Sequence, residues 1–203
     1  SVDEILSSRV FEIVEQKTGL DILPVYDSEA TKTTGLYLRI LQERANPRAD
    51  VFWNSEFSRT LLLKEEGLLE PHLSEAVASI PDRYRDRDGY WTGFSTRARV
   101  VAYNTRMVSA TEVPRSMAEL EVAKWKGRVA WANPLFGTTA THCGALLADL
   151  GGDSFRSKMK TWSSHFKQVA SNGQTAELVA RGAVLLALTD TDDVWRLKLE
   201  GEP

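Results

Sequence analysis

Hydrophobic positions along the first half of the chain alternate between two spacings, one typical of helices and one typical of buried strands. Apolar residues recur every three or four positions through residues 2–14, 33–44 and 59–66, which predicts three helices. Short apolar runs at 21–26 and 49–53 lie between them and predict strands. This rhythm is typical of a mostly parallel sheet covered by helices, so the pattern predicts the α/β class.

The second half repeats the rhythm after a stretch rich in Arg and Asp at 82–89, which we expect to be an exposed loop. Strands are predicted at 90–94, 97–103, 128–133, near 169 and at 183–188, and helices from Ser116 to Lys126 and at 138–150, 154–165 and 174–181. Because one set of elements gives way to another near residues 95–105, we expect two lobes. We place them at residues 1–98 and 99–203.

Composition narrows the function classes. The chain has 203 residues and a formal net charge of −3. It therefore lacks the excess of Lys and Arg that is expected of a nucleic-acid binder. Its single cysteine, Cys143, excludes an internal disulfide and a cysteine metal cage. The longest apolar runs, such as 183–188, are too short to cross a bilayer. The N-terminal residues lack the pattern of a signal peptide, as they also would in a mature secreted protein.

Several junctions between a strand and the following helix carry hydroxyl and amide side chains. Thr33 and Thr34 open one helix, and Gly137, Thr138 and Thr139 open another, while Asn172 precedes a third. Helix N-termini present free N–H groups and a partial positive charge, so these positions favour an anion. Simple helix capping remains the alternative, since Ser, Thr and Asn are the usual capping residues.

Three aspartates crowd the end of a predicted strand in LALTDTDDVW. Asp190, Asp192 and Asp193 repel one another unless a cation, a proton or hydrogen-bond donors compensate, so oxygen ligation of a hard cation is one interpretation and helix capping another. The same residues fit the DxDx(T/V) signature of haloacid-dehalogenase-type phosphotransferases, with Asp190 as nucleophile and Mg²⁺ between carboxylates. That signature stands nine residues from the end here, without its downstream motifs, so an enzyme is the lesser alternative.

Five blocks carry a family resemblance in their order and spacing: YDSEATKTTGL, RADVFWNSE, GYWTGFSTRARVVAYNT, WKGRVAWANPLFGTTATH and LTDTDDVW. Together they resemble the extracellular solute-binding proteins of ABC importers, in the group that includes ferric-ion-binding proteins. The resemblance implies a type II periplasmic binding fold, in which two α/β lobes close over a ligand and present it to a membrane permease. It also implies a periplasmic or extracellular location, no catalysis and no catalytic cofactor.

The resemblance assigns ligand-binding roles to residues of both lobes: Thr33, Thr34, Asn54, Glu56, Arg97, Gly137, Thr138, Thr139 and Asn172. The turn at Gly137 and the amide of Asn172 match positions that hold the anion accompanying a metal, or the ligand's own anionic group. Arg97 lies at the crossover between lobes, where it pairs with an anion or braces the hinge. A hard cation would be held by Glu56, Asp190 and Asp192.

Two departures from the family pattern shape the expected cargo. Ferric binders that use tyrosinate carry a tyrosine pair just before the position of Trp195, where this chain has aspartates and a valine. Ferric iron held by tyrosinate is therefore unsupported. We still expect a metal cargo, with iron first, held by carboxylates and accompanied by an anion, and keep a small organic or phosphorylated anion as the alternative. Segments that the family has at both ends are also missing, which predicts an incomplete first lobe with exposed apolar surface and self-association as one consequence.

Overall fold

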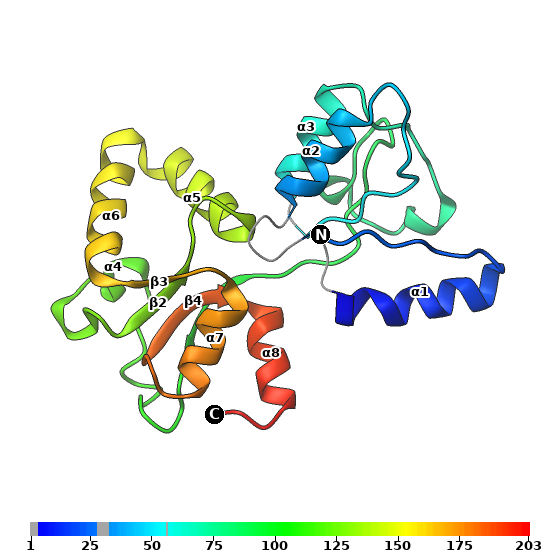
Figure 1. Cartoon of the computed structure of the whole chain (residues 1–203). Helices are drawn as coiled ribbons and strands as arrows, with labels where there is room; N and C mark the ends of the chain where they lie inside the picture. The colour runs from blue at the N-terminus through cyan, green and yellow to red at the C-terminus, as the bar shows by residue number, and fades with distance from the viewer. Residues whose placement is uncertain (1–3, 28–32, 56) are drawn as a thin grey trace. The chain divides into compact units, whose positions relative to one another are not determined.

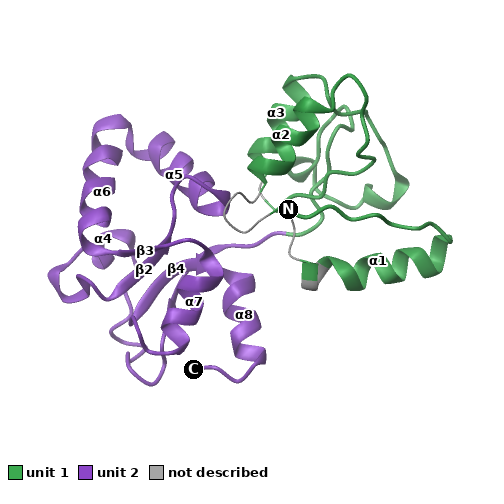
Figure 2. Cartoon of the chain, viewed as in Figure 1, with its two compact units in different colours: residues 1–95 green, residues 96–203 purple. Residues whose placement is uncertain are grey.

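The computed structural model describes residues 4–27, 33–55 and 57–203, which form two compact units (Figure 2). Unit 1 comprises residues 1–95 and unit 2 residues 96–203. Among the described residues, none of the helices combines the length and hydropathy that crossing a membrane requires.

Unit 1 contains the three predicted helices but not the predicted strands. The helices are α1 (Glu4–Thr18), α2 (Thr34–Gln42) and α3 (Ser58–Glu65), followed by 3-10 turns at Glu75–Val77 and Asp82–Tyr84. Segments 21–26, 49–53 and 90–94 carry no strand, and the described residues of this unit hold only an isolated bridge between Arg85 and Thr92. The strand predictions here are wrong because an apolar extended segment becomes a strand only when a neighbouring backbone pairs with it.

Unit 2 is built on a four-stranded sheet in the order β1-β4-β2-β3. Its strands are β1 (Arg99–Tyr103), β2 (Val129–Ala132), β3 (Lys167–Val169) and β4 (Leu186–Asp190). β2 runs parallel to both β3 and β4, whereas β1 is antiparallel to β4. The predicted parallel sheet is confirmed in this unit, with one antiparallel edge strand. β4 extends past its predicted end at residue 188, because Asp190 still pairs with β1.

Five helices surround the sheet: α4 (Met117–Leu120), α5 (Gly137–Leu150), α6 (Gly152–His165), α7 (Asn172–Ala180) and α8 (Thr191–Leu199). The helix predicted from Ser116 is shorter than expected, since it stops at Leu120 and a separate 3-10 turn follows at Ala123–Trp125. Its predicted cap is confirmed, because the Ser116 side chain accepts a hydrogen bond from the Glu119 backbone N–H at 3.3 Å.

Side-chain alternation along the strands creates two unequal core layers. Trp131 and Leu188 face the larger layer, which contains Trp162 of α6 and Cys143 of α5. The intervening alanines, such as Ala187, face the smaller layer, which contains Val179 of α7. Small residues let α7 pack closely on one face of the sheet, while α5 and α6 cover the other (Figure 1). This sandwich holds the carboxyl ends of β2, β3 and β4 at one edge.

Candidate functional site

Three helices start at the carboxyl edge of the unit 2 sheet. The parallel strands β2, β3 and β4 each end there and lead into α5, α7 and α8. β1 begins at the same edge because it runs the other way, with Arg99 paired in register opposite Asp190. Ligand sites of open α/β sheets lie outside such an edge, where helix N-termini and strand ends meet.

Asp190 occupies the centre of this edge. Its side chain is 1% exposed, and its Oδ1 accepts a hydrogen bond from Arg99 Nη1 at 2.9 Å. Its Oδ2 accepts hydrogen bonds from Thr138 Oγ1 at 2.5 Å and from Asn172 Nδ2 at 3.0 Å. A buried carboxylate is stable only with a counter-charge and hydrogen bonds, and here α5, α7 and β1 supply them.

The side chain of Asn172 is fully engaged within this group. Its Nδ2 donates to Asp190 and to Thr138 Oγ1, the latter at 2.8 Å. Its Oδ1 accepts from Arg99 Nη1 at 2.9 Å and from Thr139 Oγ1 at 3.1 Å. A carboxamide offers two N–H donors and two acceptor lone pairs, so all four are used. The structure thus brings the predicted residues Thr138, Thr139 and Asn172 together around Asp190.

Gly137 is the first residue of α5 and has a positive φ of 55°. A glycine adopts this backbone conformation without steric cost. The N-cap residue Phe136 makes no side-chain hydrogen bond to the helix. The first turn of α5 therefore begins without a capping side chain.

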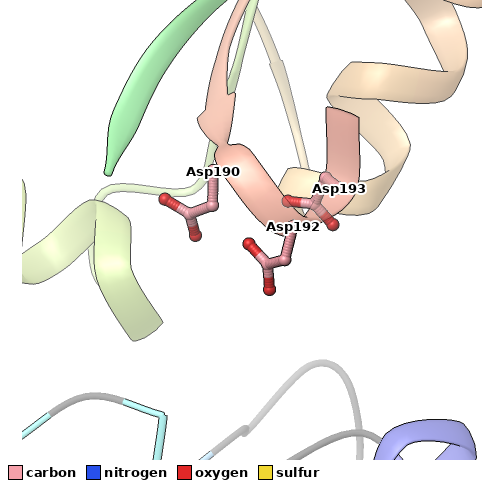
Figure 3. Close-up of side chains that lie close together, drawn as sticks. All are labelled: Asp190, Asp192 and Asp193. Carbon is pink, nitrogen blue, oxygen red and sulfur yellow. The ribbon is translucent and has the colours of Figure 1, made fainter. Parts of the chain in front are cut away.

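Asp192 and Asp193 lie in the first turn of α8, beside Asp190 at the end of β4 (Figure 3). One carboxylate oxygen of each of the three residues lies within 4.8 Å of the others. Arg97 Nη1 donates to Asp192 Oδ2 at 2.6 Å, and these side chains are 28% and 36% exposed respectively. Arg97 and Asp192 are thus half-buried, whereas Asp190 is buried.

Asp193 is the half-buried member of the cluster. Its Oδ2 lies 2.9 Å from the hydroxyl of Thr189, whose other neighbour is the Asn172 carbonyl oxygen at 3.0 Å. Burial, with the nearby charges of Asp192 and Asp190 adding to it, raises the pKa of Asp193 to about 6. Close carboxylates that cannot all ionise freely are a feature of sites for protons or cations.

Two participants were missing from the predicted site residues. The sequence predicts Arg97 at the crossover but not Arg99, which pairs with Asp190. The signal was available, since residues two apart in an extended segment point to the same side. Asp193 was noticed in the aspartate run but not chosen as a ligand, because sequence spacing does not reveal which carboxylates of a helix turn face one another.

Unit 1 brings two of its predicted residues together. Thr33 Oγ1 lies 3.4 Å from Asn54 Oδ1, and Asn54 Nδ2 donates to Thr60 Oγ1 at 3.1 Å. Thr34 is the first residue of α2, and Thr33 before it has φ 74°, a strained conformation for a β-branched residue. The predicted metal ligand Glu56 lies outside the described residues.

Comparison with known sequences shows one family. The profile of the bacterial extracellular solute-binding proteins matches residues 46–194. The chain is 33% identical over 174 residues to iron uptake protein A1 of Synechocystis, covering 84% of this chain and 48% of that protein. It is 27% identical over 146 residues to the Fe(3+)-binding periplasmic protein of Serratia marcescens, covering 72% and 43%. The chain thus spans about half the length of the curated relatives that it matches.

Comparison with solved structures agrees on the fold. Iron-bound HitA from Pseudomonas aeruginosa superposes with a TM-score of 0.89 at 23% identity, covering 98% of this chain and 63% of that one. The Trichodesmium protein IdiA (FutA), solved with iron and citrate, superposes with a TM-score of 0.75 at 27% identity, covering 95% and 60%. The expected fold, a two-lobed α/β periplasmic-binding type, is therefore confirmed.

Proposed function

This chain belongs to the family of bacterial extracellular solute-binding proteins, and we propose that it is the ligand-capturing component of an ABC importer with a metal ion as cargo. Ferric iron is the first candidate, because relatives with similar sequences are named for iron uptake or Fe(3+) binding. The partner would be a membrane permease, and the place of action the periplasm or the cell exterior. Binding and release suffice for this role, and we propose no catalytic step.

The observation that supports a metal cargo is the cluster of carboxylate oxygens at the end of β4 and the start of α8. Hard cations prefer oxygen ligands, and carboxylates that lie this close repel one another until a cation compensates them. Both oxygens of Asp190 already accept hydrogen bonds. Asp192 and Asp193 are therefore the ligands that we assign in unit 2, with Arg97 moving away from Asp192 as the cation arrives.

The phosphotransferase alternative finds no support in this geometry. Its nucleophile would be Asp190, whose side chain is 1% exposed and bound by Arg99. A nucleophilic carboxylate must reach a phosphorus atom with a free oxygen, whereas Asp190 offers none at the surface. A Mg²⁺-dependent hydrolysis assay with a generic phosphate ester is expected to show no turnover.

Metal titration of the purified, chelator-treated protein tests the proposal. We expect ferric nitrilotriacetate to bind with a calorimetric signal and to raise the melting temperature, since a ligand at 100 times its Kd stabilises the folded state by about 2.7 kcal/mol. Asp192→Asn should weaken binding by at least about tenfold. Asp153→Asn, which removes an exposed carboxylate on α6, is the matched control and should leave binding unchanged.

If ferric iron does not bind, titration with other ligands decides which class of cargo the chain binds. If neither ferric iron nor divalent metals raise the melting temperature, while phosphate or a sugar phosphate does, the chain is an anion binder and the metal proposal is refuted. A loss of binding in Asp153→Asn equal to that in Asp192→Asn would refute the assignment of the site.

A further inference from the structure

We infer that Asp190 is a built-in anion, which fills the place where donors from α5, α7 and β1 converge, so that metal capture needs no anion from solution there. The family resemblance implies that the donors of α5 and α7 hold an anion that accompanies the cargo. The structure places a carboxylate of the protein itself among them. The inference rests on the proposed metal cargo for its function, and on this donor geometry for its physical basis.

The first step is that the side-chain donors of Thr138 and Asn172 are all used within the protein. Thr138 has one hydroxyl hydrogen, and it lies in the 2.5 Å bond to Asp190. Both amide hydrogens of Asn172 are used, one on Asp190 and one on Thr138. An external anion would have to break these bonds in order to gain equivalent ones. Exchange of equal hydrogen bonds yields little net free energy, so an external anion gains no advantage from these groups.

The second step concerns charge and burial. Asp190 and Arg99 form an ion pair in which the carboxylate is 1% and the arginine 16% exposed. Arg97 Nη1 lies 3.7 Å from Asp190 Oδ2, which adds a second positive charge at this carboxylate. The N-termini of α5 and α7 contribute partial positive charge on the same side. Without Asp190, the guanidinium of Arg99 would lose its buried counter-charge, and a carboxylate-sized gap would remain beside it.

Chemical rescue tests the geometry. In Asp190→Ala we expect a lower melting temperature than in the wild type, because Arg99 loses its buried partner. Sodium formate should restore it by at least about 3 °C beyond the effect of equal sodium chloride, since formate replaces the lost carboxylate. Asp193→Ala is the matched control: it removes a neighbouring carboxylate bonded to Thr189 but to no arginine. Formate should stabilise Asp193→Ala no more than the wild type.

Metal binding by the unaltered chain tests the second part of the inference, that metal capture needs no anion from solution. We expect the Kd for ferric iron, measured by competition with nitrilotriacetate, to be the same within about twofold in bicarbonate-free buffer and after addition of bicarbonate. This measurement needs no variant, so it decides the inference even if Asp190→Ala does not fold. A gain in affinity of about tenfold or more with bicarbonate would overturn it.

The two experiments separate the inference from the proposed function. If formate restores Asp190→Ala but the wild type binds no metal, the metal cargo is refuted and the built-in anion stands. If the wild type binds iron only with bicarbonate and formate has no effect, the metal cargo stands and the built-in anion is refuted.

Discussion

Replacing Asp193 by Asn is expected to remove a pH-dependent loss of stability in unit 2. Burial is the main reason why the pKa of this carboxyl rises from 3.8 to about 6 in the folded protein. The hydroxyl of Thr189 opposes only part of this rise, because it donates to the ionised carboxyl at 2.9 Å but is shared with a second acceptor. Thr189 has a single hydroxyl hydrogen, and two acceptors, Asp193 and the Asn172 carbonyl, lie within 3.0 Å of it. A protonated Asp193 donates to Thr189 and lets that hydroxyl donate to the carbonyl.

The direction of the effect follows from proton binding. Between about pH 4 and pH 6 the folded chain holds a proton on Asp193 that the unfolded chain has released, so the free energy of unfolding falls as pH rises. The full contribution is present below pH 4 and is lost above pH 6. A rise of about two pKa units corresponds to about 3 kcal/mol. Since Asp193 is half-buried, solvent screening lowers the expected loss to about 2 kcal/mol.

Urea unfolding of the chelator-treated protein at intervals from pH 4 to pH 8 measures the effect. Amide exchange of β4 follows unit 2 specifically, because β4 is one of the two buried inner strands of its sheet. Asp193→Asn should abolish the pH dependence that Asp193 causes. It should also be the more stable protein at pH 7.5, since a neutral amide costs less to bury than an ionised carboxyl. Asp153→Asn, an exposed change, should keep the wild-type slope. Parallel slopes in Asp193→Asn and wild type would refute the reasoning.

Two further predictions concern unit 2. Glu121→Ala should lower the free energy of unfolding by about 1–3 kcal/mol, because the buried indole N–H of Trp162 loses its 2.7 Å acceptor. Glu112→Ala, in an exposed pair, should change it by no more than about 0.5 kcal/mol, and equal losses in urea melts would contradict this. Gly151→Ala should cost about 1–3 kcal/mol, since φ 75° and ψ 165° suit glycine alone. Gly144→Ala inside α5 should instead stabilise the protein by about 0.5–1 kcal/mol, because an added Cβ meets no atom within 4 Å. Thermal melts compare the two variants. If Gly151→Ala and Gly144→Ala both lower the melting temperature, backbone strain at Gly151 does not explain its loss of stability.

The local sequence pattern was sufficient to predict the helices and most strands of unit 2. In the RVAWAN and LALTD segments the side chains alternate between two buried layers, and the helices between them have apolar stripes that fit these layers. The junctions that carry Thr138, Asn172 and Asp190 were predicted for the same reason, since each follows a recognisable strand. In unit 1 the same reasoning failed at segments such as 49–53, because apolar composition does not supply the partner backbone that a strand requires.

Tertiary structure alone decided what surrounds Asp190. The antiparallel pairing of β1 with β4 places Arg99 opposite a residue 91 positions later in the chain, and no local pattern encodes that register. The sequence indicated an aspartate cluster and a set of anion-favouring donors as separate features. Their mutual engagement depends on three helices starting at one edge of one sheet, where a buried negative charge is stable only because donors from distant segments meet it.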